Sequence, residues 1–166
     1  MKRDGQADAT LRKAGISAQK LRKIEPLMLS PWEVTIPKGV GGADEDIPGL
    51  KVPNPVTFIA QKILIRDVRK RKGKASQDIL YIHDTVQIFG DEVGSLAALW
   101  SDDLAAKLSL EERAAVIDGV DRIFSRVADD LRDAALIPQG RGLNPDEMRD
   151  VCEMVLKEIF KSIARP

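Results

Sequence analysis

The chain has 166 residues, of which 43% are hydrophobic and 31% charged, so it can bury the core of one ordinary domain and is not disordered by composition. A single cysteine and a single histidine exclude an internal disulfide and metal sites rich in Cys or His, and two Trp, one Tyr and four Phe are too few for a base-stacking platform. No apolar run reaches the roughly 18 residues of a membrane span, so we expect a reduced, cytoplasmic protein outside the membrane.

The net charge of zero hides an asymmetry between the two halves of the chain. Residues 1–83 carry 16 basic and 9 acidic side chains, whereas residues 84–166 carry 10 and 17. A basic half can contact a polyanion, or the two halves can attract each other. A third interpretation is that both are simply solvated surfaces.

The N-terminal segment predicts short helices. We expect two of them within Ala7–Glu25, broken at Gly15, with Ser17 capping the second. The basic stretch from Leu11 to Ile24 also resembles the turn of a helix-turn-helix. A helix-turn-helix needs a further supporting helix, however, and a proline-rich stretch follows instead.

A small β-hairpin is predicted next. Trp32–Ile36 alternates apolar and polar residues, which indicates a strand with one buried face. The glycine-rich and acidic stretch Lys38–Asp46 is typical of a turn, and Leu50–Val52 is the expected returning strand.

Helical periodicity dominates the rest of the chain. The expected helices are Val56–Lys72, one capped by Ser76 and running to Phe89, one carrying Leu96–Leu104, one from the capping box Ser109/Glu112 to Leu136, and one from the cap Asn144 whose apolar stripe reaches Ile163. The predicted fold is mainly α (α+β), a bundle of about five helices with a small N-terminal hairpin. Residues 1–54 and 55–166 form its two parts within one continuous domain.

Three features that can carry chemistry are better explained by structure. His83 and Cys152 could form a nucleophilic pair, but Cys152 lies on an apolar helical stripe, where cysteine is a small buried hydrophobe. The loop Gly39–Gly42 lacks the Lys-Ser/Thr ending of a phosphate-binding P-loop. Asp44–Asp46 could bind a hard cation, although adjacent acids in such a loop are usually solvated.

The densest functional signal is the basic stretch from Lys62 to Lys74, where seven basic residues accompany one acid. Lys62, Arg66 and Arg69 are spaced i, i+4, i+7, so they are predicted to lie on one side of a helix. Lys74 and Asp78 follow at the start of the next helix. Like charges so close require a carboxylate or a bound anion, so the stretch is either a phosphate site or a solvated basic surface.

These residues also carry a resemblance. The run Pro55–Lys62, then Arg69, Lys74 and Asp78–Thr85, ending at Phe89-Gly90, is similar to the C-terminal half of bacterial nucleotidyltransferase-fold proteins, the group that includes the abortive-infection toxin type. The flanks Ala14–Val34 and Gly140–Pro145, with the helix around Ile159-Phe160, resemble the same fold.

The resemblance implies a phosphate-facing role for Lys62, Arg66, Arg69 and Lys74, with Asp78 as their orienting carboxylate. Complete relatives hold Mg²⁺ and a nucleoside triphosphate with a Gly-Ser turn and an Asp-x-Asp strand about ten residues later. Here Gly41-Gly42 runs almost directly into Asp44–Asp46, which does not fit that spacing. The resemblance therefore implies the rear portion of such a protein, as a truncated frame, a degenerate copy or a separate subunit.

We accordingly expect no catalytic residue, metal or cofactor in this chain alone. The expected partner is a second copy, giving a dimer, or the missing catalytic half, together with a nucleotide. The alternative function is a helical module that binds nucleic acid or a partner subunit through its basic N-terminal half.

Overall fold

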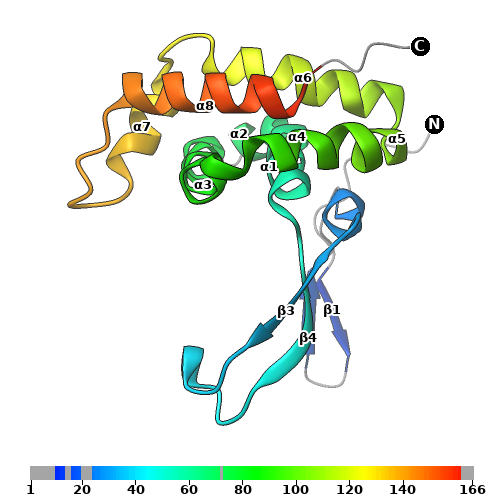
Figure 1. The fold of residues 1–166 in the computed structure, drawn as a ribbon. Coiled ribbons are helices and arrows are strands. Elements are labelled where there is room, and N and C mark those ends of the chain that lie inside the picture. The colour runs from blue at the N-terminus through cyan, green and yellow to red at the C-terminus, as the bar shows by residue number, and fades with distance from the viewer. Residues whose placement is uncertain (1–9, 14–15, 20–23, 72, 162–166) are drawn as a thin grey trace.

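The computed structural model describes residues 10–13, 16–19, 24–71 and 73–161, which form a helical body and two antiparallel hairpins. The predicted mainly α (α+β) fold is confirmed. Figure 1 shows the helices gathered together and one long hairpin projecting from them. Gly15, Lys72 and Ile163, on which sequence predictions depended, lie outside the described residues.

Within the described residues, the strands come before the α-helices along the chain. The strands are β1 (Thr10–Lys13), β2 (Ile16–Gln19), β3 (Trp32–Ile36) and β4 (Ile47–Val52). The helices are α1 (Pro55–Leu64), α2 (Arg66–Arg71), α3 (Ala75–Phe89), α4 (Val93–Leu99), α5 (Ala105–Lys107), α6 (Leu110–Phe124), α7 (Asp129–Leu136) and α8 (Pro145–Ile159). Short 3₁₀ turns cover Glu25–Met28, Val40–Gly42 and Gly90–Glu92, and a π-helix covers Trp100–Leu104.

The prediction of two N-terminal helices is wrong. Thr10–Lys13 and Ile16–Gln19 are extended and pair antiparallel, with Thr10 opposite Gln19 and Lys13 opposite Ile16. In this register the backbone N–H and C=O groups form hydrogen bonds between the two strands. Only two residues separate the strands in sequence, which is the spacing of a tight hairpin. Ser17 is therefore a strand residue and not a helix cap, and the helix-turn-helix interpretation fails with it.

The predicted hairpin from Trp32 to Val52 is confirmed, and we call it the arm. Its returning strand β4 is longer than expected. Three apolar pairs oppose one another across the arm, and opposing residues share a face of a sheet. The pairs are Trp32 with Val52, Val34 with Leu50, and Ile36 with Ile47.

The base of the arm is fastened to the helical body by Asn54, which is fully buried. Its Nδ2 donates to the carbonyl oxygens of Leu29 and Ser30 at 3.1 and 3.0 Å, and its Oδ1 accepts from the Thr57 backbone N–H at 2.9 Å. The same side chain therefore caps α1 and holds the segment that leads into β3. Trp32 adds an edge-to-face contact with Phe89 of α3, with ring centroids 5.6 Å apart.

The helix predicted over Val56–Lys72 is interrupted. It breaks at Ile65, which separates α1 from α2, before Gly73 ends the segment in a left-handed conformation with φ of 66°. The next helix begins at Ala75, so Ser76 lies inside α3 and does not cap it.

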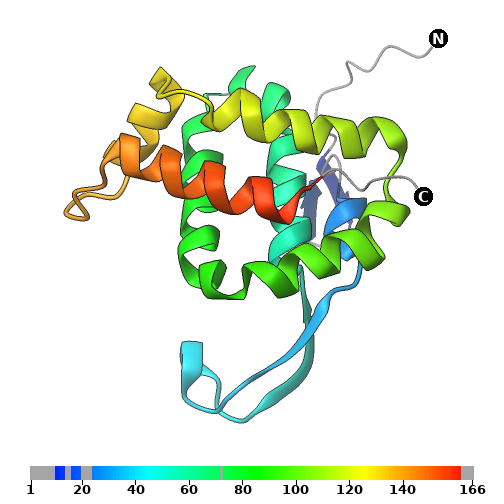
Figure 2. The same cartoon turned by 45° about the horizontal axis from the view of Figure 1, so that its top comes forward.

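The helix predicted from Ser109 to Leu136 is two helices. The capping box of Ser109 and Glu112 is confirmed at its start, but α6 ends at Phe124 and α7 begins at Asp129. The predicted start of α8 is also confirmed, because Asn144 Oδ1 accepts from the Asp146 backbone N–H at 2.9 Å. Figure 2 shows α8 crossing one side of the helical body, where it packs on α3, α4, α6 and α7.

One apolar core joins these helices, as the periodicity predicted. It includes the fully buried or nearly fully buried side chains Val56, Ile59, Ile63, Ile79, Ile82, Leu104, Val116, Phe124, Leu131, Met148, Cys152 and Leu156. Trp100 packs edge-to-face on Phe160 with ring centroids 4.9 Å apart. Within the described part of the chain, no helix combines the length and apolar character needed to cross a membrane.

Candidate functional site

Asp78 is the centre of the predicted basic site. It lies in the first turn of α3 and its side chain is 3% exposed. Arg69 of α2 donates to it twice, from Nε to Oδ2 at 2.7 Å and from Nη2 to Oδ1 at 3.1 Å. Lys62 of α1 adds an ion pair, with Nζ 3.3 Å from Oδ1. The sequence therefore identified three residues from three helices that converge, and we call Lys62, Arg69 and Asp78 the Asp78 cluster.

The Asp78 cluster is held in one geometry by the planar fork of Arg69. Two parallel hydrogen bonds to one carboxylate fix the guanidinium and the carboxylate relative to each other. The hydrogen bonds that Arg69 donates to Asp78 raise the pKa of Arg69 above its usual value. Two cations face one carboxylate, so the cluster keeps a net positive charge.

Two aromatic rings surround the ammonium group of Lys62. Its Nζ lies 5.0 Å from the ring centroid of Phe58 and 5.3 Å from that of Tyr81. Tyr81 is held by Gln77, whose Nε2 donates to the phenol oxygen at 2.8 Å. Rings at this distance attract a cation and limit its motion. Sequence reasoning missed both rings, although Phe58 and Tyr81 stand in the predicted helices at i−4 from Lys62 and i+3 from Asp78.

Arg66 does not join the Asp78 cluster, contrary to the i, i+4, i+7 prediction. Its Nη2 donates to Asp130 of α7 at 2.6 Å, and Lys70 Nζ lies 3.5 Å from the same carboxylate oxygen. The break at Ile65 and the start of a separate helix at Asp129 explain the difference. The acidic pair Asp129-Asp130 is a first-turn signal that could have located this helix start.

Lys74 is the most open of the predicted cations. Its side chain is exposed, while its backbone N–H donates to the Arg69 carbonyl at 2.9 Å and its carbonyl accepts from the Asp78 N–H at 3.3 Å. The backbone therefore ties Lys74 to both Arg69 and Asp78.

The residues considered for other chemistry have structural roles. Burial raises the pKa of the Cys152 thiol to about 12, so the thiol is protonated at neutral pH and is a poor nucleophile. Asp46 lies in the turn of the arm, where its Oδ1 accepts from the Lys38 backbone N–H at 2.8 Å. Among the described residues, no three His, Cys, Asp or Glu side chains come together to hold a metal ion.

Comparisons with known proteins add one finding to this geometry. The model of a family described as Nucleotidyltransferase matches residues 1–105. That range contains the arm and the whole Asp78 cluster, whereas α6, α7 and α8 lie beyond it. Neither the curated proteins nor the solved structures give a match.

Proposed function

Because the chain belongs to a nucleotidyltransferase family, we propose that Lys62, Arg69 and Lys74 contact the phosphate groups of a nucleotide and that Asp78 orients them. The observation that carries this proposal is the convergence of two cations from different helices on one buried carboxylate. Such a cluster needs no rearrangement to meet a ligand, because Asp78 already holds Lys62 and Arg69 in place.

The hydrogen-bonding capacity of the cluster supports the proposal. Arg69 donates to Asp78 from Nε and from one N–H of Nη2, and within the described residues its Nη1 and the second Nη2 proton have no acceptor. Lys62 contacts Asp78 through an ion pair, and its ammonium group carries three protons that can be donated. Phosphate oxygens accept several charge-assisted hydrogen bonds at once, and the exposed Lys74 adds another donor.

We further propose that this chain alone does not transfer a nucleotide. Active relatives are expected to hold Mg²⁺ on an Asp-x-Asp strand, and the Asp-x-Asp sequence of this chain, Asp44–Asp46, lies in the turn of the arm. Among the described residues no group of three or more His, Cys, Asp or Glu side chains could hold a metal ion, and we assign no transfer step to this chain. Incubation with labelled nucleoside triphosphates, Mg²⁺ or Mn²⁺, and RNA or protein should give no labelled product. Metal-dependent labelling that persists through repurification would contradict this proposal.

Thermal unfolding with and without ATP tests the phosphate site. A ligand that binds only the folded state at ten times its Kd stabilises it by roughly 1.4 kcal/mol, which is a rise of about 3–6 °C in melting temperature at this size. The double variant Lys62→Ala/Lys74→Ala should lose this rise. The control Lys38→Ala/Lys51→Ala removes two exposed lysines of the arm and should keep it. An unchanged response of the Lys62→Ala/Lys74→Ala protein would show that these cations are a solvated surface.

A nucleic-acid module remains the alternative, and the exposed side chains of Lys70, Arg71 and Lys74 favour it. A polyanion would contact all three, and the dependence of its affinity on salt would weaken when they are removed. A mononucleotide needs only the Asp78 cluster and Lys74. The double variant Lys70→Ala/Arg71→Ala therefore distinguishes a nucleic-acid module from a mononucleotide site. It should reduce the salt dependence of RNA binding and leave the rise in melting temperature with ATP intact.

A further inference from the structure

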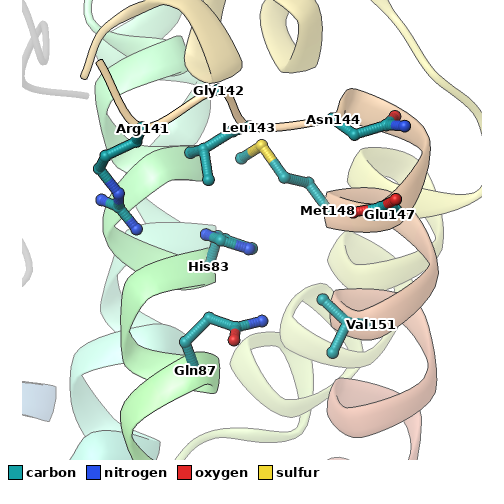
Figure 3. Close-up of a pocket in the computed structure, with 9 residues that line it drawn as sticks. All are labelled: His83, Gln87, Arg141, Gly142, Leu143, Asn144, Glu147, Met148 and Val151. Carbon is teal, nitrogen blue, oxygen red and sulfur yellow. The ribbon is translucent and has the colours of Figure 1, made fainter. Parts of the chain in front are cut away.

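A cavity of about 440 Å³ opens between α3 and the start of α8, away from the Asp78 cluster. Figure 3 shows His83 and Gln87 of α3 on one side and Met148 and Val151 of α8 on the other, with Leu143 from the preceding loop. Asp78 faces α1 and α2 from the same helix α3, so the two sites lie on different sides of it.

The walls of the cavity combine apolar surfaces with a few polar groups. Leu143, Met148 and Val151 supply the apolar surfaces, while Gln87 and Glu147 supply an amide and a carboxylate at the opening. Sites for small organic molecules are typically lined in this way and have volumes of roughly 300–1,000 Å³.

His83 gives the cavity its one buried polar group. It is 5% exposed, and its ring reaches into the cavity in Figure 3. Nδ1 lies 3.4 Å from Asp84 Oδ1, and Arg141 holds that carboxylate with two hydrogen bonds of 2.7 and 3.1 Å. Within the described part of the chain, Nε2 has no hydrogen-bond partner. With the ring proton on Nδ1 toward Asp84, Nε2 presents a lone pair to the cavity.

The charges around the cavity favour a neutral ligand that donates hydrogen bonds. Asp84 neutralises the charge of Arg141, whereas the Asp78 cluster has two cations for one carboxylate, and Glu147 adds negative charge at the rim. The start of α8 offers little to an anion, because Pro145 has no N–H and Asn144 already accepts from the Asp146 N–H. A phosphate is therefore a poor occupant, and a group with an amine is a good one.

We infer that this cavity binds a purine base that carries an exocyclic amine, as adenine does. The Gln87 side-chain amide is suited to pair with the amine and the neighbouring ring nitrogen, an arrangement that proteins use to read adenine. Gln87 follows His83 by four residues on α3, so both side chains face the same ligand. Nε2 of His83 accepts a second proton of the base or of its sugar, and the apolar side chains cover the ring faces.

Adenosine and inosine provide a matched pair of probes, since inosine has a carbonyl where adenosine has the amine. His83 is the single histidine of the chain, so its ring signals in an NMR spectrum are assigned without ambiguity. We expect adenosine to shift these signals with saturation, and inosine to bind roughly tenfold more weakly. Equal binding of the two nucleosides, or unshifted signals at millimolar adenosine, would overturn the inference.

Variants with controls on the same helices locate the ligand. Gln87→Ala should weaken adenosine binding about tenfold, whereas Gln77→Ala, which removes an amide held by Tyr81, should not. Val151→Trp fills the cavity and should abolish binding, whereas Met154→Trp places the same bulk at a position that is 67% exposed. Binding that survives Val151→Trp would refute the assignment. Lys62→Ala/Lys74→Ala should still bind adenosine, so failure of the phosphate proposal and failure of this one are distinguishable.

Discussion

The carboxylate of Asp78 organises side chains that come from three helices. Arg69 contacts it through a planar fork and Lys62 through a single ammonium, so the two cations are constrained to different degrees. Phe58 and Tyr81 compensate for this at Lys62, because their ring centroids lie 5.0 and 5.3 Å from its Nζ and the rings limit its motion. One buried carboxylate has room for only a few donors. Lys62 and Arg69 are therefore fixed beside Asp78, while Arg71 and Lys74 remain exposed to solvent.

The single histidine predicts a specific dependence of stability on pH. Burial lowers the pKa of His83 below 6.5, although the neighbouring Asp84 opposes the shift and Arg141 reinforces it. The unfolded chain therefore takes up a proton at a higher pH than the folded chain. As pH falls through about 6.5, the free energy of unfolding should decrease, by at most roughly 1.4 kcal/mol per pH unit.

Urea unfolding between pH 5 and 8 measures this effect. Carboxylates such as Asp84, whose pKa is lowered by Arg141, stay ionised over that range, so His83 dominates the slope. The variant His83→Gln should lose the slope. A titration of the His83 ring signals in the folded protein gives the pKa directly, and a value above 6.5 would contradict the prediction.

The spacing of nearby residues predicted part of the site, but it could not predict contacts between residues distant in sequence. Lys62, Arg69 and Asp78 lie within one stretch of the chain, where helical periodicity and charge already suggested a meeting. Arg66 pairs with Asp130, 64 positions away, and these residues belong to α2 and α7, which are separate helices only because the chain breaks at Ile65 and after Phe124. Nothing in the spacing of Asp84 and Arg141 indicates their pairing across 57 positions.

At the scale of the elements, signals within one helical turn predicted the structure well. Ser109 with Glu112, and Asn144 with Pro145, marked the starts of α6 and α8 because a cap acts through its own backbone. The N-terminal hairpin was missed because its stability comes from pairing between β1 and β2, and four-residue strands show too little alternation to outweigh helical spacing. The helix breaks at Ile65 and after Phe124 were also missed. They carry no glycine or proline, so the helical spacing continues through them without a stop signal.

The close approach of α1 and α6 depends on Gly119. A Cβ built at this position would overlap Cγ2 of Ile63, which is 2% exposed and has no room to move. We expect Gly119→Ala to lower the free energy of unfolding by about 1–3 kcal/mol, the usual cost of overpacking a core. Chemical denaturation followed by circular dichroism measures the change.

Gly94 provides the matched control, because it lies in α4 with open space around it. Gly94→Ala should raise the free energy of unfolding by roughly 0.5–1 kcal/mol, since alanine favours helix and orders fewer backbone states than glycine. Equal effects of the two substitutions would show that α1 and α6 adjust easily and that Gly119 is no packing constraint.

For the whole molecule, the unusual feature is an arm whose apolar face is only partly covered within the part of the chain that the structure describes. Trp32, Val34 and Ile36 are half-buried, and Leu50 and Ile47 are 41% and 46% exposed. Among the described residues, β3 and β4 have only each other as neighbours, so each also presents an open edge. A two-stranded sheet is marginal alone in water, and an open edge favours association.

We therefore expect the protein to self-associate through the arm, most simply as a dimer with two-fold symmetry. Light scattering over the micromolar range should show a mass that increases with concentration. Leu50→Lys places a charge on the apolar face and should yield monomers, whereas Thr35→Lys, on the opposite face of the same arm, should still associate. The helices have their own caps and core, so Leu50→Lys should leave their circular dichroism signal unchanged. A monomer at all concentrations, with residues 30–53 protected from hydrogen exchange, would show that the chain completes its own core.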